Sequence, residues 1–299
     1  MPSLHPQLQD SLAETVEIIQ NEIDGFLPLS GNPEERVVEA MRYAALSGGK
    51  RLRPFLCMSA AKMFGVDQMR AKRVATAIEM VHCYSLIHDD LPAMDNSDLR
   101  RGKPTVHKQF DEATAILAGD GLLTYAFEIL GNNATHDDPT VRAHLVLGLA
   151  KAAGTSGLVG GQMLDLIAEK QQLDIGQTTR LQRMKTGELI AFSCEAGAIL
   201  GRASQHQRDA LRKYAHDLGL AFQMIDDLLD VESTEAELGK PVHKDAAAGK
   251  ATFVTILGAD RTRAQAQLLS TQAQRHLDIF ESRGQMLRDV AQFVVERRK

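Results

Sequence analysis

The sequence predicts an all-α protein, a single-domain bundle of ten or more helices. Apolar residues recur at helical spacing along nearly the whole chain, and no segment shows the two-residue alternation of a half-buried strand. Glycine and proline interrupt this periodicity at intervals that suit helices of ordinary length. Because no linker-like stretch divides the 299 residues, we predict one domain over residues 1–299.

The first fifty residues contain two predicted helices. An apolar stripe at helical spacing predicts the first one: Leu8, Leu12, Val16, Ile19 and Ile23. Gly25 and Pro28 end this helix. Pro33 and the two acids after it suit the first turn of a second helix, which extends to the glycine pair at 48–49.

Residues 50–105 contain a short helix, a long helix and a loop. A short apolar helix follows Pro54 and ends near Gly65. Asp67 can cap the long helix that extends to Asp89. Proline disfavours helical geometry at the residue before it, so Pro92 predicts a polar, basic loop over residues 92–105.

Helical periodicity resumes after this loop and continues to the C-terminus. Two long helices are expected, over residues 174–202 and 205–231. The expected breaks are Gly131, Gly154, the glycine-rich segment 157–165, the loop 239–249, Gly258 and Gly284.

Composition narrows the classes of function. Acids and bases are mixed at a net charge of −5, which does not favour a nucleic-acid surface. Cys57, Cys83 and Cys194 lie far apart in apolar sequence, as reduced core thiols do. The first ten residues are polar, unlike a signal peptide, and no apolar run approaches the roughly 18–20 residues of a membrane span. We therefore expect a cytoplasmic protein with no membrane span and no nucleic-acid partner.

Two acid-rich clusters close apolar helices, and their carboxylates are candidate Mg²⁺ ligands: Asp89, Asp90, Asp95, Asp226, Asp227 and Asp230. Carboxylates beside apolar helix are costly unless a cation is bound there. Mg²⁺ takes hard oxygen ligands and is typically shared between carboxylates and a substrate phosphate. The alternative is that both clusters are solvated helix ends, but each is followed by basic residues, which favours a bound anion.

The spacing of the acids suits shared metal ions. Asp226 and Asp230 are four residues apart, so they lie on one helical face, about 6 Å apart along the axis. Asp89 and Asp95 are six apart and would diverge on an unbroken helix. The break at Pro92 can bring Asp95 back, so a metal site here requires the helix to end at this point.

Basic residues near these clusters form candidate anion sites. In the segment 48–54, Lys50 and Arg53 can direct their cations at one phosphate, with glycine permitting close backbone approach. Arg100 and Arg101 follow the first acid cluster, and Lys240, Lys244 and Lys250 follow the second. Acids that hold metal and bases that hold phosphate make a diphosphate clamp. The alternatives are a solvated surface or mutual salt bridges.

Two short signals are less specific. The pair His88-Asp89 occurs in metal phosphohydrolases, but two residues match often by chance. Glu79 and His82 form half of a di-iron bundle signature, which needs a second pair that the sequence lacks.

Together these residues resemble the trans-isoprenyl diphosphate synthase family, most closely its bacterial-type farnesyl diphosphate synthases, over about residues 35–299. The resemblance rests on Gly49-Lys50-Arg51-Leu52-Arg53-Pro54, the first acid cluster with Arg100-Arg101-Gly102, Gly161-Gln162 with Asp165, Lys185-Thr186-Gly187, Phe222-Gln223 before the second acid cluster, and Gly239-Lys240 with Gly249-Lys250. It implies helices around a deep central cavity and usually a homodimer. The implied reaction condenses an allylic diphosphate with isopentenyl diphosphate and releases diphosphate.

The resemblance also implies roles for individual residues. The metal site, with three Mg²⁺ ions and Gln162 beside it, would comprise Asp89, Asp90, Asp95, Asp165, Asp226, Asp227 and Asp230. Isopentenyl diphosphate would be held by Lys50, Arg53, His82 and Arg101. The allylic diphosphate would be contacted by Arg100, Lys185, Thr186, Gln223, Lys240 and Lys250. Within this set, Lys185, Thr186 and Gln223 would turn dipole oxygens toward the carbocation, while diphosphate itself would accept the proton.

Product length depends on the helix before Asp89. Tyr84 and Ser85 lie five and four residues earlier, about 6 to 7.5 Å deeper along the helix. By the resemblance, bulky Tyr84 would form the cavity floor and limit the product to C15. Ile225 departs from the farnesyl pattern and also occurs in geranylgeranyl enzymes.

Several alternatives stay open. Within enzymes they are a geranyl or geranylgeranyl diphosphate synthase, or a class I terpene cyclase. A cyclase does not need Lys50, Arg53 and His82 for a second diphosphate. A non-catalytic subunit of the same fold should have lost acidic motifs, and here both are present.

Overall fold

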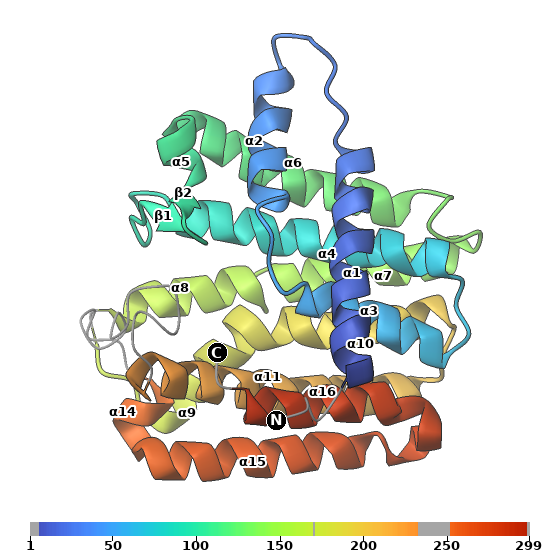
Figure 1. Cartoon of the computed structure of the whole chain (residues 1–299), viewed down its shortest axis with the longest axis vertical. Helices are drawn as coiled ribbons and strands as arrows, with labels where there is room; N and C mark the ends of the chain where they lie inside the picture. Colours follow the sequence, from blue (N-terminus) through green and yellow to red (C-terminus); the bar gives the residue numbers. More distant parts are fainter. Residues whose placement is uncertain (1–5, 170, 233–251, 298–299) are drawn as a thin grey trace.

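The computed structural model describes residues 6–169, 171–232 and 252–297, and these are almost entirely helical (Figure 1). The first half contains α1 (Pro6–Phe26), α2 (Glu35–Ala45), α3 (Leu52–Met63), α4 (Gln68–Asp89), α5 (Val106–Gln109), α6 (Glu112–Gly131) and α7 (Pro139–Ala153). The second half contains α8 (Leu158–Ala168), α9 (Ile175–Gln182), a π-helical turn (Arg183–Gly187), α10 (Glu188–Leu200), α11 (Gln205–Glu232), α14 (Phe253–Leu257), α15 (Ala259–His276), a 3₁₀ turn (Asp278–Gly284) and α16 (Gln285–Glu296). The predicted all-α class is confirmed.

A short hairpin lies in the loop after α4, where no strand was predicted. β1 (Leu99–Arg100) pairs with β2 (Lys103–Pro104) in antiparallel register. The two residues between them, Arg101 and Gly102, have φ of 54° and 76°. Positive φ at both central residues is the requirement of the tight turn that suits a hairpin. Strands of two residues are too short to show alternation, so the sequence pattern could not reveal them.

The helix predicted over residues 174–202 is divided by a π turn. α9, the π turn and α10 follow one another without a break, and the π turn contains Lys185 and Thr186. A π turn inserts an extra residue into the helical repeat and often occurs at functional sites. The apolar periodicity extends across it, which is why the sequence predicted one regular helix.

Helix α10 lies between two apolar cores. The first core is formed mainly by α1, α2, α4, α6 and α7, and the second mainly by α3, α11, α15 and α16. Leu189 and Phe192 belong to the first core, and Ile190 and Cys194 to the second. A helix that is apolar all round is buried on all sides, as α10 is. Figure 1 shows this layering, with α4 and α6 on one side of α10 and α11, α15 and α16 on the other.

Helix α6 contradicts the expectation that no segment is apolar over the length of a membrane span. Over its 20 residues it is long and apolar enough to cross a membrane by length and composition. In the fold, α6 packs against α4 and α2, and its Ala115, Ala118 and Leu122 are completely buried. Packing on these helices accounts for its apolar content within a globular bundle.

Some predictions lie outside the described residues. The loop predicted over residues 239–249 and the candidate anion ligands Lys240, Lys244 and Lys250 belong to this group.

Candidate active site

The first acid cluster lies where α4 ends. Asp67 caps the start of α4 by accepting a hydrogen bond from the Met69 N–H at 2.8 Å, as predicted. At the other end the chain reverses, and the Asp95 N–H donates to the Asp89 carbonyl at 2.8 Å. Asn96 adopts a φ of 46° in this reversal. The break predicted from Pro92 therefore brings Asp95 back beside Asp89.

Asp90 is paired within the same loop. Arg100 donates two hydrogen bonds to it, Nε to Oδ2 and Nη2 to Oδ1, each at 2.7 Å. The Asp90 side chain is 4% exposed and that of Arg100 is 36% exposed. A bidentate pair of this kind has a fixed geometry. Arg100 thus neutralises Asp90 while its outer part stays accessible to an anion.

Asp89 faces a second wall formed by α8 and the π turn. Burial raises the pKa of Asp89 to about 6, and the charges of Lys185, Asp95, Arg100 and Asp165 also act on it. The neighbouring carboxylates raise this pKa, whereas the cations lower it. Three predicted metal ligands from two regions of the sequence therefore lie within electrostatic reach of one another.

Gly161 allows this wall to form. A Cβ at Gly161 would lie 2.2 Å from the Lys185 backbone nitrogen, so no other residue permits α8 to approach the π turn this closely. The approach brings the Lys185 Nζ within 2.7 Å of the Asp165 Oδ2. Gln162, next to this glycine, is buried. Its Nε2 has no hydrogen-bond partner among the described residues.

The second acid cluster lies in the last turns of α11. Asp227 is buried and accepts from the Gln223 Nε2 at 3.0 Å and from the Phe253 N–H at 2.9 Å. Asp230, one turn on, is also buried. Asp226 is 37% exposed, and its Oδ1 lies 2.7 Å from the Arg297 Nη2. Of these three carboxylates, Asp226 is therefore the most accessible to solvent.

Arg297 comes from the C-terminal end of the described chain. Its Nη2 also donates to the Phe222 carbonyl at 2.9 Å, and its guanidinium lies 4.0 Å from the centre of the Phe222 ring. Sequence reasoning left the position of the basic tail open. The only signal was its net positive charge, and the partner lies 71 residues away along the chain.

The basic loop after α2 is built around a buried ion pair. Arg51 adopts a φ of 48°, and its side chain is buried against Glu79, with Nη1 to Oε1 at 2.6 Å. Arg51 is therefore structural, whereas sequence reasoning gave it no separate role. A lone acid inside the apolar run of α4, Glu79, was the signal for such a partner.

Arg101 is held against the same loop. Its guanidinium lies 2.7 Å from the position that a Cβ of Gly49 would take, and its Nη1 donates to the Gly48 carbonyl. Gly49 has a φ of 127°, a conformation suited to glycine. The hairpin and the basic loop thus meet through one arginine.

Three of the four predicted ligands of isopentenyl diphosphate lie near one another here: Arg53, His82 and Arg101. Burial, and then the charges of Arg53, Arg101, Arg100 and Arg51, hold the pKa of His82 well below its ordinary value. Burial lowers the pKa of Arg53 too, and its buried Nε has no partner among the described residues. More cations than acids lie close together here, since Glu79 pairs with Arg51 and Asp90 with Arg100, and such an excess of positive charge suits an anion of high charge.

The donor set fits Mg²⁺. The crowded carboxylates around Asp89 have oxygen ligands of the kind that Mg²⁺ prefers, and a bound cation would relieve their repulsion. Among the described residues, no group of three or more His, Cys, Asp or Glu side chains is placed to hold a metal by itself. Mg²⁺ usually keeps waters and binds through one or two carboxylates together with substrate phosphates. A diphosphate would therefore complete such a site.

Tyr84 and Ser85 lie deeper along α4 and are buried. The Tyr84 ring meets the His88 ring edge to face, with centroids 5.6 Å apart. The Ser85 hydroxyl donates to the His82 carbonyl at 2.8 Å. Burial and the nearby Asp89 charge raise the pKa of Tyr84, so its phenol stays neutral at physiological pH.

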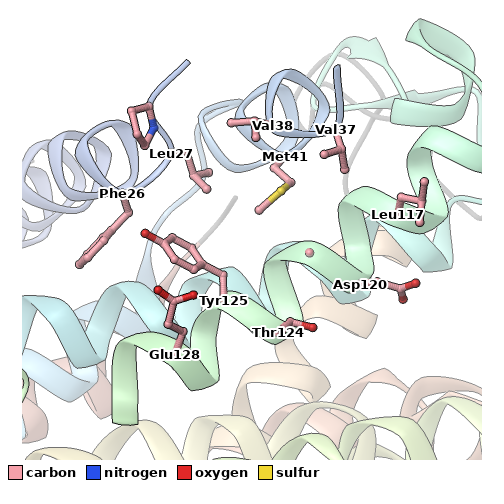
Figure 2. Close-up of a pocket in the computed structure, with 12 residues that line it drawn as sticks. Phe26, Leu27, Val37, Val38, Met41, Leu117, Asp120, Thr124, Tyr125 and Glu128 are labelled. Atoms are coloured by element: carbon pink, nitrogen blue, oxygen red, sulfur yellow. The ribbon is translucent and has the colours of Figure 1, made fainter. Parts of the chain in front are cut away.

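A separate groove lies between α2 and α6 (Figure 2). It has a volume of about 570 Å³. Met41 of α2 faces α6, and its sulfur lies 2.9 Å from the position that a Cβ of Gly121 would take. None of the predicted site residues lines this groove.

An all-α bundle with two acid clusters and a basic loop fits a prenyltransferase of isoprenoid biosynthesis, the class that the family and the relatives of this chain support. The chain belongs to the polyprenyl synthetase family, whose model matches residues 34–287. It is a short-chain trans-prenyltransferase, and its family typically uses Mg²⁺. These findings confirm the resemblance drawn from the sequence.

Relatives include synthases of more than one product. The chain is 42% identical to a farnesyl diphosphate synthase of Geobacillus stearothermophilus, over 97% of this chain and 98% of that protein. It is 44% identical to a chloroplastic heterodimeric geranylgeranyl pyrophosphate synthase large subunit of Arabidopsis thaliana, over 89% of this chain and 72% of that protein. A solved FPP/GFPP synthase of Zymomonas mobilis superposes with a TM-score of 0.88 at 48% identity, covering 97% of this chain and 99% of that one.

Proposed function

We propose that this protein is a Mg²⁺-dependent farnesyl diphosphate synthase. It condenses dimethylallyl or geranyl diphosphate with isopentenyl diphosphate, head to tail, and releases diphosphate. The observation that carries this proposal is the buried Tyr84 ring, five residues before Asp89 on α4. An aromatic side chain in this place supports a cavity closed at C15.

Carboxylates from three parts of the chain would act together. Asp89 and Asp95 at the end of α4, Asp165 on α8 and Asp226 on α11 would hold Mg²⁺ around the allylic diphosphate. When bound, the metal supplies positive charge to the leaving group. Lys185, which lies 2.7 Å from Asp165, would contact the same diphosphate.

The basic loop would hold the second substrate. Lys50, Arg53, His82 and Arg101 would contact isopentenyl diphosphate, and His82 would be neutral there because its pKa is lowered. Thr186 and Gln223 would present dipoles to the developing carbocation. Buried apolar surface around Tyr84 would exclude water from that cation.

Chromatography of the prenyl product tests the proposal. We expect C15 from the wild-type enzyme and longer chains from Tyr84→Ala, because removing the ring deepens the cavity. Tyr214→Phe is a matched control, since that buried tyrosine lies on α11 and bonds the Leu287 carbonyl in the second core. A C15 product from Tyr84→Ala would exclude Tyr84 as the floor.

The second candidate is a geranylgeranyl diphosphate synthase. It is favoured by the relatives of that name and by apolar Ile225, which is buried on α11. A predominant C20 product from the wild-type enzyme would establish it. A non-catalytic subunit would instead release no diphosphate when supplied with Mg²⁺ and both substrates.

We also propose a homodimer. Apolar side chains are exposed on the neighbouring helices α6 and α7: Ile116, Leu117 and Leu147. Exposed large apolar side chains on helices that contact each other are a feature that protein interfaces use. Sedimentation should give twice the monomer mass for the wild type, and Leu117→Lys should weaken association. A monomeric wild type would contradict this. We also propose that the protein is located in the cytoplasm.

A further inference from the structure

His88 is the residue before Asp89, and the sequence alone gave it no role. In the structure its Nε2 lies 3.0 Å from the Ile116 carbonyl oxygen of α6. A carbonyl can only accept, so Nε2 carries the proton in this contact. The Asp120 carboxylate is farther from Nε2, at 3.9 Å. The imidazole therefore links the end of α4 to the backbone of α6.

Gly119 makes room for this contact. A Cβ at Gly119 would lie 2.1 Å from the His88 Nε2 and 2.5 Å from its Cδ2. Any larger residue would displace the ring. The backbone of Gly119 is ordinary helix, so glycine is needed here for space and not for conformation.

The other contact of His88 is with Tyr84. The rings are edge to face, with an interplanar angle of 85°. Aromatic pairs prefer this arrangement because the positive edge of one ring meets the negative face of the other. The two residues are one helical turn apart, so the same face of α4 carries both rings. His88 thus connects Tyr84 to a fixed point on α6.

We propose that His88, seated on Gly119, is a positioning residue that holds Tyr84 as the floor of the product cavity and so restricts chain length. This inference rests on the proposed function. The His88 ring braces Tyr84 from one side, and its hydrogen bond to Ile116 prevents the ring from swinging away. Without that brace, the Tyr84 side chain would yield to a growing prenyl chain.

The product ratio of His88 variants tests the inference. We expect His88→Ala to raise the ratio of C20 to C15 product about fivefold or more, the change that the loss of one hydrogen bond corresponds to. Gly119→Ala should act in the same direction, since its methyl group displaces the ring. His88→Gln keeps a donor for Ile116, and His88→Phe keeps a ring for Tyr84. Each should give an intermediate ratio.

His276→Ala is the matched control. Its Nε2 lies 3.1 Å from Asp217, and its side chain is 26% exposed, compared with 27% for His88. It lies at the end of α15, in a different core from Tyr84. A general loss of stability would lower turnover in both histidine variants, but only the His88 variants should change the product ratio.

The outcomes separate the two proposals. If Tyr84→Ala lengthens the product while folded His88→Ala and Gly119→Ala retain the wild-type ratio, the role of His88 is overturned and the proposed function stands. If Tyr84→Ala leaves a C15 product unchanged, Tyr84 is not the floor of the cavity, and the role of His88 is overturned with it. A wild-type enzyme that makes no C15 product overturns the proposed function itself. If His88→Ala does not fold, the product ratios of His88→Phe and Gly119→Ala still test the role of His88.

Discussion

The two acid clusters carry the same chemistry but are neutralised in different ways. In the first, the counter-charge for Asp90 is Arg100, ten residues further along the chain. In the second, the counter-charge for Asp226 is Arg297, 71 residues away and directly after the end of α16. The first cluster is therefore assembled by a local loop, whereas the second depends on the packing of the C-terminal helix against α11.

Burial also differs between the clusters. The Asp90 side chain is 4% exposed, so its charge requires a partner inside the protein. Asp226 is 37% exposed and keeps contact with water. The difference teaches that one pair maintains the fold around the site, while the other holds a carboxylate that remains accessible.

The largest effect on turnover is expected from removing one accessible carboxylate of each acid cluster. We predict that Asp89→Asn and Asp226→Asn each lower turnover by about 10²-fold or more, since each would remove a metal ligand that stabilises the leaving diphosphate. Diphosphate release at saturating Mg²⁺ measures this. Asp217→Asn, on α11 outside the cluster, is the control. Turnover near that of the wild type in either variant would show that the carboxylate it removes is not a metal ligand.

A smaller effect should distinguish the two arginines. We predict that Arg100→Leu lowers the free energy of unfolding by about 3 kcal/mol, because it leaves Asp90 buried without its partner. Arg297→Leu should lower it by about 1 kcal/mol or less, because the exposed Asp226 can be solvated instead. Urea denaturation without metal measures both. Equal losses would show that the two clusters do not differ in the way that their burial indicates.

A third effect, smaller than that of Arg100→Leu, concerns the pH dependence of α11. Burial, and then the Arg183 and Arg212 charges, lower the pKa of His216 on this helix from 6.5 to about 4. The unfolded chain therefore binds the extra proton first, and stability present above pH 6.5 is lost as the pH falls toward 4. We predict a loss of about 2 kcal/mol in that window for the wild type.

His216→Gln should remove this part of the pH dependence. The difference between the urea-unfolding profiles of the two proteins isolates the histidine, since all other groups are shared. Parallel profiles from pH 4 to 7 would mean that the imidazole is solvated. Arg100→Leu is the control, because it retains His216 and should therefore keep this part of the pH dependence.

Much of the site was predictable because its causes are local. Pro92 ends α4, and this break alone brings Asp95 back to Asp89. The four-residue spacing of Asp226 and Asp230 holds as expected on one helix, α11. Helix ends and helical faces depend on neighbouring residues, so a single sequence contains the information for them.

Other features were not predictable because they depend on close approach between elements. The sequence alone does not show that Arg51 is buried against Glu79, whereas the nearby Arg53 keeps a buried Nε without a partner among the described residues. The positive φ at Arg51 and the contact of α8 with the π turn at Gly161 come from packing. Which polar side chains pair depends on the distances between them, and the packing of the helices sets those distances.

The sequence by itself determined the helical class, the ends of the major helices and the two clusters of carboxylates with their nearby cations. These follow from periodicity, proline and charge, which act over a few residues. Only the tertiary structure decided which arginine neutralises which aspartate, and it seated His88 on Gly119 beside Tyr84. Ion pairs and ring contacts act over a few ångströms, and the packing of α4, α6, α11 and α16 sets those distances.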